Sequence, residues 1–148
     1  MIEIKNIEKT KLKEYALLKT IEKFSNIKKN IRIIFTNRLT YYGRYTYLCK
    51  EKKHQIEIST TVFQYADRNA RIYEMIGSIL HELKHAEQQE KMGSPKMMSK
   101  QYHKNNRIKN SGAADFFSIC ESEARIAEEI NLMPATDYYW KCLSKLVK

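Results

Sequence analysis

The sequence of 148 residues predicts an α+β fold in a single domain spanning residues 1–148. Short runs rich in β-branched and aromatic residues fall between residues 31 and 60, which is typical of strands. Apolar residues at helical spacing flank these runs, before residue 26 and after residue 70. Glycine and proline are scarce, with 4 and 2 copies, so long flexible linkers are not expected.

The N-terminal part is expected to form one helix followed by three strands. Residues 7–25 place apolar side chains at helical intervals with lysines between them, which predicts an amphipathic helix. Residues 31–36 (IRIIFT) predict a strand, and residues 39–50 alternate around Gly43, where a bend or bulge is expected. Residues 54–60 (HQIEIST) alternate again after a turn-like EKK segment. Together these segments predict a small, mostly antiparallel sheet.

The remaining chain is expected to be helical. From Arg71 onward, apolar residues recur at i, i+3, i+4 and i+7, which predicts a helix ending near Met92. A polar, basic and aperiodic stretch follows it. A second helix is expected over residues 114–131, closed by Pro134, and a short C-terminal helix over residues 137–147. The side chains of this last helix that are expected to reach the core are Tyr138, Trp140 and Leu143.

The charge is strongly basic and unevenly distributed. The formal net charge is +10; residues 1–60 carry 14 basic and 6 acidic side chains, whereas residues 121–148 carry 4 and 5. Such a balance permits binding to nucleic acid or an acidic protein, although a solvated lysine-rich surface also accounts for it. No signal peptide or membrane span is expected, and three scattered cysteines without a CxxC motif are typical of reduced thiols. We therefore expect a cytoplasmic protein.

Residues 79–88, which read ILHELKHAEQ, contain the clearest chemical motif. His81 and His85 lie four positions apart on a predicted helix, so they project from one face about 5–6 Å apart. This spacing allows both imidazoles to reach one Zn²⁺ at about 2.0–2.1 Å. Glu82 is placed to hold a water at the metal and to act as the general base. The alternative is two unconnected surface histidines on a charged helix.

A catalytic zinc usually has three protein ligands and one open position. A metzincin would need a histidine six positions after His85, where this chain has Lys91. Glu121 is favoured because the small Ala124, three residues later, would let its helix approach the first one closely. The candidates that remain beside it are Glu123, His103 and His54.

HExxH on one helix, followed by E-x-E-A on the next, resembles the gluzincin branch of zincin metallopeptidases. The chain resembles minigluzincins and ImmA/IrrE-like peptidase domains over about residues 30–135. This resemblance implies a zincin-like fold and a zinc peptidase in which Glu82 is the general base. The metal ligands that it implies are His81, His85 and Glu121. Arg125 stands where such families often have Asp or Asn to orient a zinc-binding histidine, so another residue must take that role.

Two alternatives remain. SprT-like proteases, which act on DNA-associated proteins, also place a strand and HExxH in a small basic domain. They take a third histidine from a glycine- and proline-containing segment, and the nearest match here, QYHKNN around His103, lacks those residues. The other alternative is a non-catalytic zinc-binding zincin-like domain that binds a protein or nucleic-acid partner.

The substrate is expected to be a peptide or protein. The strand before the HExxH helix is expected to form the rim of the cleft and to pair with an extended peptide through its edge, with Ile56 and Ile58 as contacts. His103 is a candidate donor to the oxyanion in the loop between the ligand-bearing helices. Between residues 91 and 109 the chain carries only basic charges, which favours an acidic or nucleic-acid-associated substrate.

Overall fold

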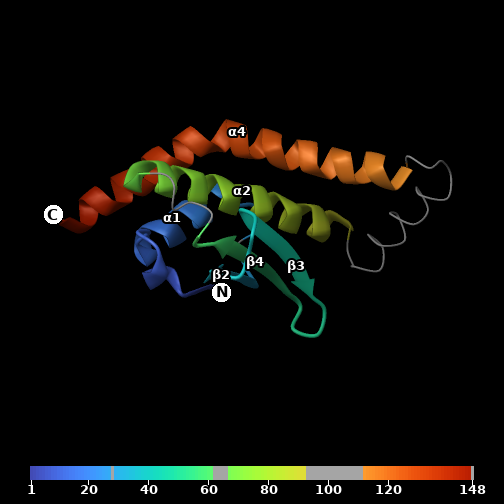
Figure 1. The fold of residues 1–148 in the computed structure, drawn as a ribbon, viewed down its shortest axis with the longest axis horizontal. Helices are drawn as coiled ribbons and strands as arrows, with labels where there is room; N and C mark the ends of the chain where they lie inside the picture. Colours follow the sequence, from blue (N-terminus) through green and yellow to red (C-terminus); the bar gives the residue numbers. More distant parts are fainter. Residues whose placement is uncertain (28, 62–66, 93–111, 148) are drawn as a thin grey trace.

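The computed structural model describes residues 1–27, 29–61, 67–92 and 112–147 (Figure 1). The elements are β1 (Ile2–Lys5), the 3₁₀ turn η1 (Ile7–Lys9), α1 (Glu14–Phe24), β2 (Ile31–Thr36), β3 (Gly43–Leu48), β4 (Lys53–Ser59), α2 (Arg68–Met92) and α4 (Gly112–Val147). Helix α2 lies over the sheet, and α4 runs along α2 on the side away from the sheet (Figure 1). The predicted α+β class is therefore confirmed.

The sheet has the order β1-β2-β4-β3 and is mixed, so the prediction of a mostly antiparallel sheet is wrong. Strands β1 and β2 are parallel because α1 carries the chain back across the sheet between them. Strand β3 forms a hairpin with β4 and lies at the edge, so β4 becomes the parallel neighbour of β2. Strand β1 is not among the predicted elements, although Ile2 and Ile4 alternate with charged residues there.

One face of the sheet forms one side of the core, and the helices form the rest. Alternate residues of β2 and β4 are fully buried, because every second side chain of a strand points to the same face. These buried residues are Ile31, Ile33, Phe35, Ile56 and Ile58. The sheet register is continuous from Gly43, which pairs with Ile58, so Gly43 begins β3 after a bend instead of forming a bulge within it.

Helix α2 begins three residues before the predicted Arg71 and ends at Met92, as predicted. Asp67 caps its N-terminus, since the backbone N–H of Ala70 donates a 2.8 Å hydrogen bond to Asp67 Oδ1. Its buried side chains include Ile72, Ile76, Ile79 and Leu83, which follow the predicted stripe.

Small residues allow α2 and α4 to approach each other closely. Ala124 of α4 is fully buried. A Cβ atom on Gly77 of α2 would lie only 2.9 Å from Glu128 Oε1 and 3.3 Å from Leu132 of α4. Substitution of Gly77 by a larger residue would therefore displace the Glu128 side chain.

The two helices predicted on either side of Pro134 form one continuous helix, α4. Proline removes one backbone hydrogen bond from a helix interior, but Pro134 lies on the exposed face, where water can reach the carbonyl of Ile130. Beyond the proline, Ala135 and Tyr139 are fully buried, and the Tyr139 hydroxyl accepts a 2.8 Å hydrogen bond from the Lys13 N–H. This packing holds the helix together across Pro134.

The residues of the C-terminal part of α4 that are buried in the core differ from those that were predicted. Tyr139 and Cys142 are buried, whereas the predicted core residues are only partly buried beside them. Those partly buried residues are Tyr138, Trp140 and Leu143. Within the described residues, no helix is both long and apolar enough to cross a membrane.

Candidate metal centre

The two histidines of HELKH lie side by side on α2, with ring centroids 5.0 Å apart. Glu121 of α4 reaches both of them. Its Oε2 lies 3.1 Å from His81 Nε2, and its Oε1 lies 2.9 Å from His85 Nε2. One possible ligand atom from each of these three residues lies within 4.8 Å of the others. The structure therefore brings together the three residues that were predicted as metal ligands.

This donor set fits zinc. Two imidazole nitrogens and one carboxylate oxygen are a common set of protein ligands to catalytic zinc. The histidines come from successive turns of one helix, and the carboxylate comes from the helix packed against it. The partners of the remaining imidazole nitrogens provide a second test of the fit.

His81 is oriented by Glu128 of α4. The Nδ1 of His81 lies 3.2 Å from Glu128 Oε2, so an Nδ1–H donates to the carboxylate and the ring is held with Nε2 facing Glu121. Glu128 follows Glu121 by seven residues, or two helical turns, so both project from the same face of α4. That spacing is visible in the sequence, although Glu128 was not predicted. It takes the role for which Arg125 is unsuited.

His85 is oriented by Gln88, which was also not predicted. The Nδ1 of His85 donates to Gln88 Oε1 over 2.8 Å, and Gln88 Nε2 donates to the Cys120 carbonyl over 2.9 Å. The second bond fixes the orientation of the amide, so its oxygen faces the imidazole. Both imidazoles thus present Nε2 toward Glu121, as a metal site with Nε2 ligation requires.

Glu82 lies beside the histidines and is only 8 % exposed. A Cβ atom on Gly43 would lie 3.2 Å from Glu82 Oε1, so the carboxyl group sits against the first residue of β3. The pKa of Glu82 is raised to about 7, mainly by burial; the neighbouring His81 opposes this shift, and the charges of Glu121 and Glu128 add to it. A carboxyl group with this pKa is suited to proton transfer at neutral pH.

A cavity of about 480 Å³ opens beside these residues. Part of its wall comes from His81, Glu82, Glu121 and Glu128. The rest includes Glu74 and Ser78, which precede His81 on α2, and residues 41–43 before and at the start of β3. Four glutamates line it, and among the described residues its basic side chains are Arg125 and His81. The glutamates are Glu74, Glu82, Glu121 and Glu128. The cavity is therefore acidic in a protein whose net charge is +10.

The other candidates for third ligand lie elsewhere. Glu123 accepts a 3.1 Å hydrogen bond from Gln88 Nε2 and is not part of the cluster. His54 is buried on β4, where its Nδ1 contacts the Tyr45 hydroxyl at 2.8 Å and its Nε2 contacts Glu90 at 2.6 Å. His103, also predicted to bind substrate, lies outside the described residues.

The prediction that Ile56 and Ile58 contact substrate is wrong. Both side chains are fully buried, and β4 lies between β2 and β3, so neither of its edges is open. Of the two strands at the edges of the sheet, β1 and β3, β3 is the one beside the candidate metal centre, and it has no second strand neighbour within the described residues. Because β3 begins at Gly43, this edge starts beside Glu82.

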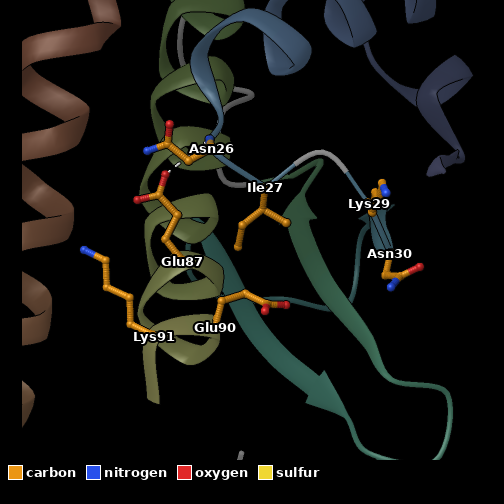
Figure 2. A pocket seen from close by; sticks show the side chains of 7 residues that line it. All are labelled: Asn26, Ile27, Lys29, Asn30, Glu87, Glu90 and Lys91. Atoms are coloured by element: carbon orange, nitrogen blue, oxygen red, sulfur yellow. Dashed lines mark hydrogen bonds between the residues drawn. The ribbon is translucent and has the colours of Figure 1, made fainter. Parts of the chain in front are cut away.

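A second cavity, of about 580 Å³, lies toward the C-terminal end of α2 (Figure 2). Its carboxylates are already engaged. Glu87 bonds to Lys84 Nζ at 2.9 Å and to the Asn26 N–H at 3.3 Å, and Glu90, which points from α2 toward the strands in Figure 2, bonds to the buried His54. Although this cavity is larger, it contains no residue of the metal centre.

The Tyr45 side chain connects the metal centre to His54, with its ring 6.5 Å from the His85 ring and 5.9 Å from the His54 ring. Tyr45→Phe should lower the free energy of unfolding by about 1–2 kcal/mol, because it leaves the buried Nδ1 of His54 without a partner. Tyr47→Phe is the control, since within the described residues the Tyr47 hydroxyl forms no hydrogen bond. Urea unfolding measures the stability of both variants. Equal losses of stability would contradict a hydrogen bond between Tyr45 and His54.

No family model, curated protein or solved structure matches this chain. Its function is therefore inferred from the side chains of the centre and from the cavity beside them. The resemblance to zincins therefore remains an expectation that rests on the HELKH motif.

Proposed function

We propose that the protein is a zinc-dependent metallopeptidase in which Glu82 is the general base. The observation that carries the proposal is the convergence of His81, His85 and Glu121 beside a buried carboxyl group. Within the described residues, Glu82 has no hydrogen-bond partner, and burying such a group costs stability. An ion-pair cluster with only a structural role gives no reason for that cost, whereas peptide hydrolysis does.

Each residue has a distinct role in the proposed reaction. Bound zinc would polarise the scissile carbonyl and acidify a water molecule. Glu82 accepts a proton from the attacking water and returns it to the leaving amine. Glu128 and Gln88 hold the two imidazoles in the orientation that keeps Nε2 available. The open edge of β3 binds an extended peptide through backbone hydrogen bonds, so that the scissile bond lies beside Glu82.

The described wall of the cavity favours basic substrates. Glu74 is exposed and forms no ion pair within the described residues, so its charge is available to a ligand. It precedes His81 by seven residues, about 10 Å along α2, which an extended peptide spans in about three residues. The predicted preference for acidic substrates depends on residues 91–109, nearly all of which lie outside the described residues.

Glu74→Gln should raise KM for peptides that carry lysine or arginine within about three residues of the scissile bond, by about 3- to 10-fold, because one partly solvated ion pair is lost. The KM for matched neutral peptides should change little. Steady-state kinetics on paired peptides measure the difference. Equal changes for both peptides would exclude a charge-based role for Glu74.

Metal analysis tests the proposed function most directly. Wild-type protein purified without chelators should contain one zinc per chain, and the zinc-loaded protein should cleave members of a peptide library. Zinc-free protein would overturn the proposal. Bound zinc without any cleavage would instead favour the non-catalytic zinc-binding alternative. A requirement for His103 in zinc binding would favour the SprT-like alternative.

A further inference from the structure

The outer face of α4 carries a stripe of exposed apolar side chains. Ile119 is 57 % exposed, Ile126 is 55 % exposed, Ile130 is 67 % exposed and Met133 is 58 % exposed. Their spacings of seven, four and three residues place them on one face of the helix. This apolar stripe lies opposite Ala124 and Ala135, which pack inward. Single exposed apolar residues are ordinary, but a contiguous set on one helix face marks an interaction surface.

Acidic residues flank the centre of the apolar stripe, which consists of Ile126, Ile130 and Met133. Glu123 and Asp137 lie seven residues before and after Ile130, and therefore in line with it along the helix. Glu123, Glu129 and Asp137 are all exposed, and Glu123 keeps its negative charge while it accepts the hydrogen bond from the neutral Gln88 amide. The surface therefore consists of an apolar centre with a negative charge toward each end, on a protein whose net charge is +10.

These charges disfavour a second copy of the chain as the occupant. In an antiparallel pair of α4 helices centred on Ile130, Glu123 of one copy meets Asp137 of the other. In a parallel pair, each acidic residue meets its own equivalent. Both arrangements place like charges together, which opposes association. A partner with basic residues at the same positions has the complementary charge.

We propose that the outer face of α4 docks a basic amphipathic helix of another protein. The partner's apolar residues, at i, i+3 or i+4 and i+7, contact the apolar stripe. Its lysine or arginine residues lie near Glu123 and Asp137. The basic remainder of the surface repels such a helix, so the charge directs it to α4 or to the acidic cavity. Those two destinations can be separated, because they lie on different faces of α4.

The test uses a synthetic 18-residue helical peptide with leucine at i, i+3, i+4 and i+7 and lysine elsewhere, and a matched peptide with glutamate in place of lysine. Fluorescence anisotropy measures binding to the full chain. The lysine peptide should bind, and Ile126→Ser and Ile130→Ser should each weaken it at least about tenfold. Glu74→Gln alters the cavity only, so a weakening of the lysine peptide in this variant as large as that in the serine variants would place the peptide in the cavity and overturn the proposal. Circular dichroism checks that the variants remain folded, as expected for exposed positions.

A charge swap completes the test. Glu123→Lys combined with Asp137→Lys should weaken the lysine peptide and allow the glutamate peptide to bind. The proposal is overturned if the lysine peptide does not bind, if both peptides bind wild type equally, or if the serine variants bind as wild type does. Self-association of wild type, lost in Ile130→Ser, would overturn it in favour of a second copy.

Discussion

Glu82→Gln should reduce peptide hydrolysis by about 10²- to 10⁴-fold while leaving one zinc bound per chain. An amide cannot accept the proton that the carboxylate takes from water, whereas the three proposed ligands are unchanged. The measurements are kcat/KM on a cleaved peptide and zinc content by mass spectrometry. Glu22→Gln, at an exposed position on α1 where the carboxylate pairs with Lys19, is the matched control. Full activity in Glu82→Gln would exclude Glu82 as the base.

The same substitution should stabilise the metal-free protein. Burial raises the pKa of Glu82 from 4.5 to about 7, so the folded chain holds a proton that the unfolded chain releases between these values. Stability therefore falls as the pH rises through this window and stays lower above it. Since a difference of one in pKa corresponds to about 1.4 kcal/mol, Glu82→Gln should gain on the order of 3 kcal/mol at about pH 8 and almost nothing at about pH 4.

Urea unfolding of the metal-free proteins at both pH values measures this gain. A gain that does not depend on pH would point to packing instead of charge. A gain in stability together with a loss of hydrolysis is the trade-off typical of an active site, where a residue is kept for its chemistry at a cost in stability. The change in stability therefore tests the burial of Glu82, and the change in hydrolysis independently tests its role as the base.

The clustering of His81, His85 and Glu121 could be predicted mainly because helix periodicity is local. His81 and His85 must share a face once their segment is helical, whatever the rest of the chain does. The position of Glu121 beside the histidines follows from the small residue Ala124, which indicates a close contact between the two helices. Ala124 is fully buried, and Gly77 on α2 supplies the matching small residue.

Which strand lies at the edge of the sheet beside Glu82 could not be predicted in the same way. The alternating pattern of residues 54–60 is the same in a central strand and in an edge strand with one buried face. Which strand lies at the edge depends on long-range pairing, here on β3 folding back outside β4. The four-residue strand β1 is too short for its alternation to be distinctive. Pro134 ends no helix because the buried Tyr139 holds the next turns in place.

Glu121→Ala should weaken zinc binding by more than about 100-fold, because it removes one of three proposed ligands. Glu128→Gln should weaken it by about 10- to 100-fold, the range typical of a residue that orients a ligand without touching the metal. Glu123→Ala is the matched control on the same helix. Its loss leaves Gln88 held by the Cys120 carbonyl, so His85 keeps its orientation and the zinc affinity should remain close to that of wild type.

Competition with a chromophoric chelator measures the zinc affinity of each of the three variants. The order of these affinities tests the role of each carboxylate. The ranking Glu121→Ala, then Glu128→Gln, then Glu123→Ala follows from which carboxylate contacts both Nε2 atoms, which contacts an Nδ1, and which contacts only an amide. Equal losses in Glu121→Ala and Glu123→Ala would mean that α4 supports the site only through its packing. A larger loss in Glu128→Gln than in Glu121→Ala would instead make Glu128 the ligand, with His81 bound through Nδ1.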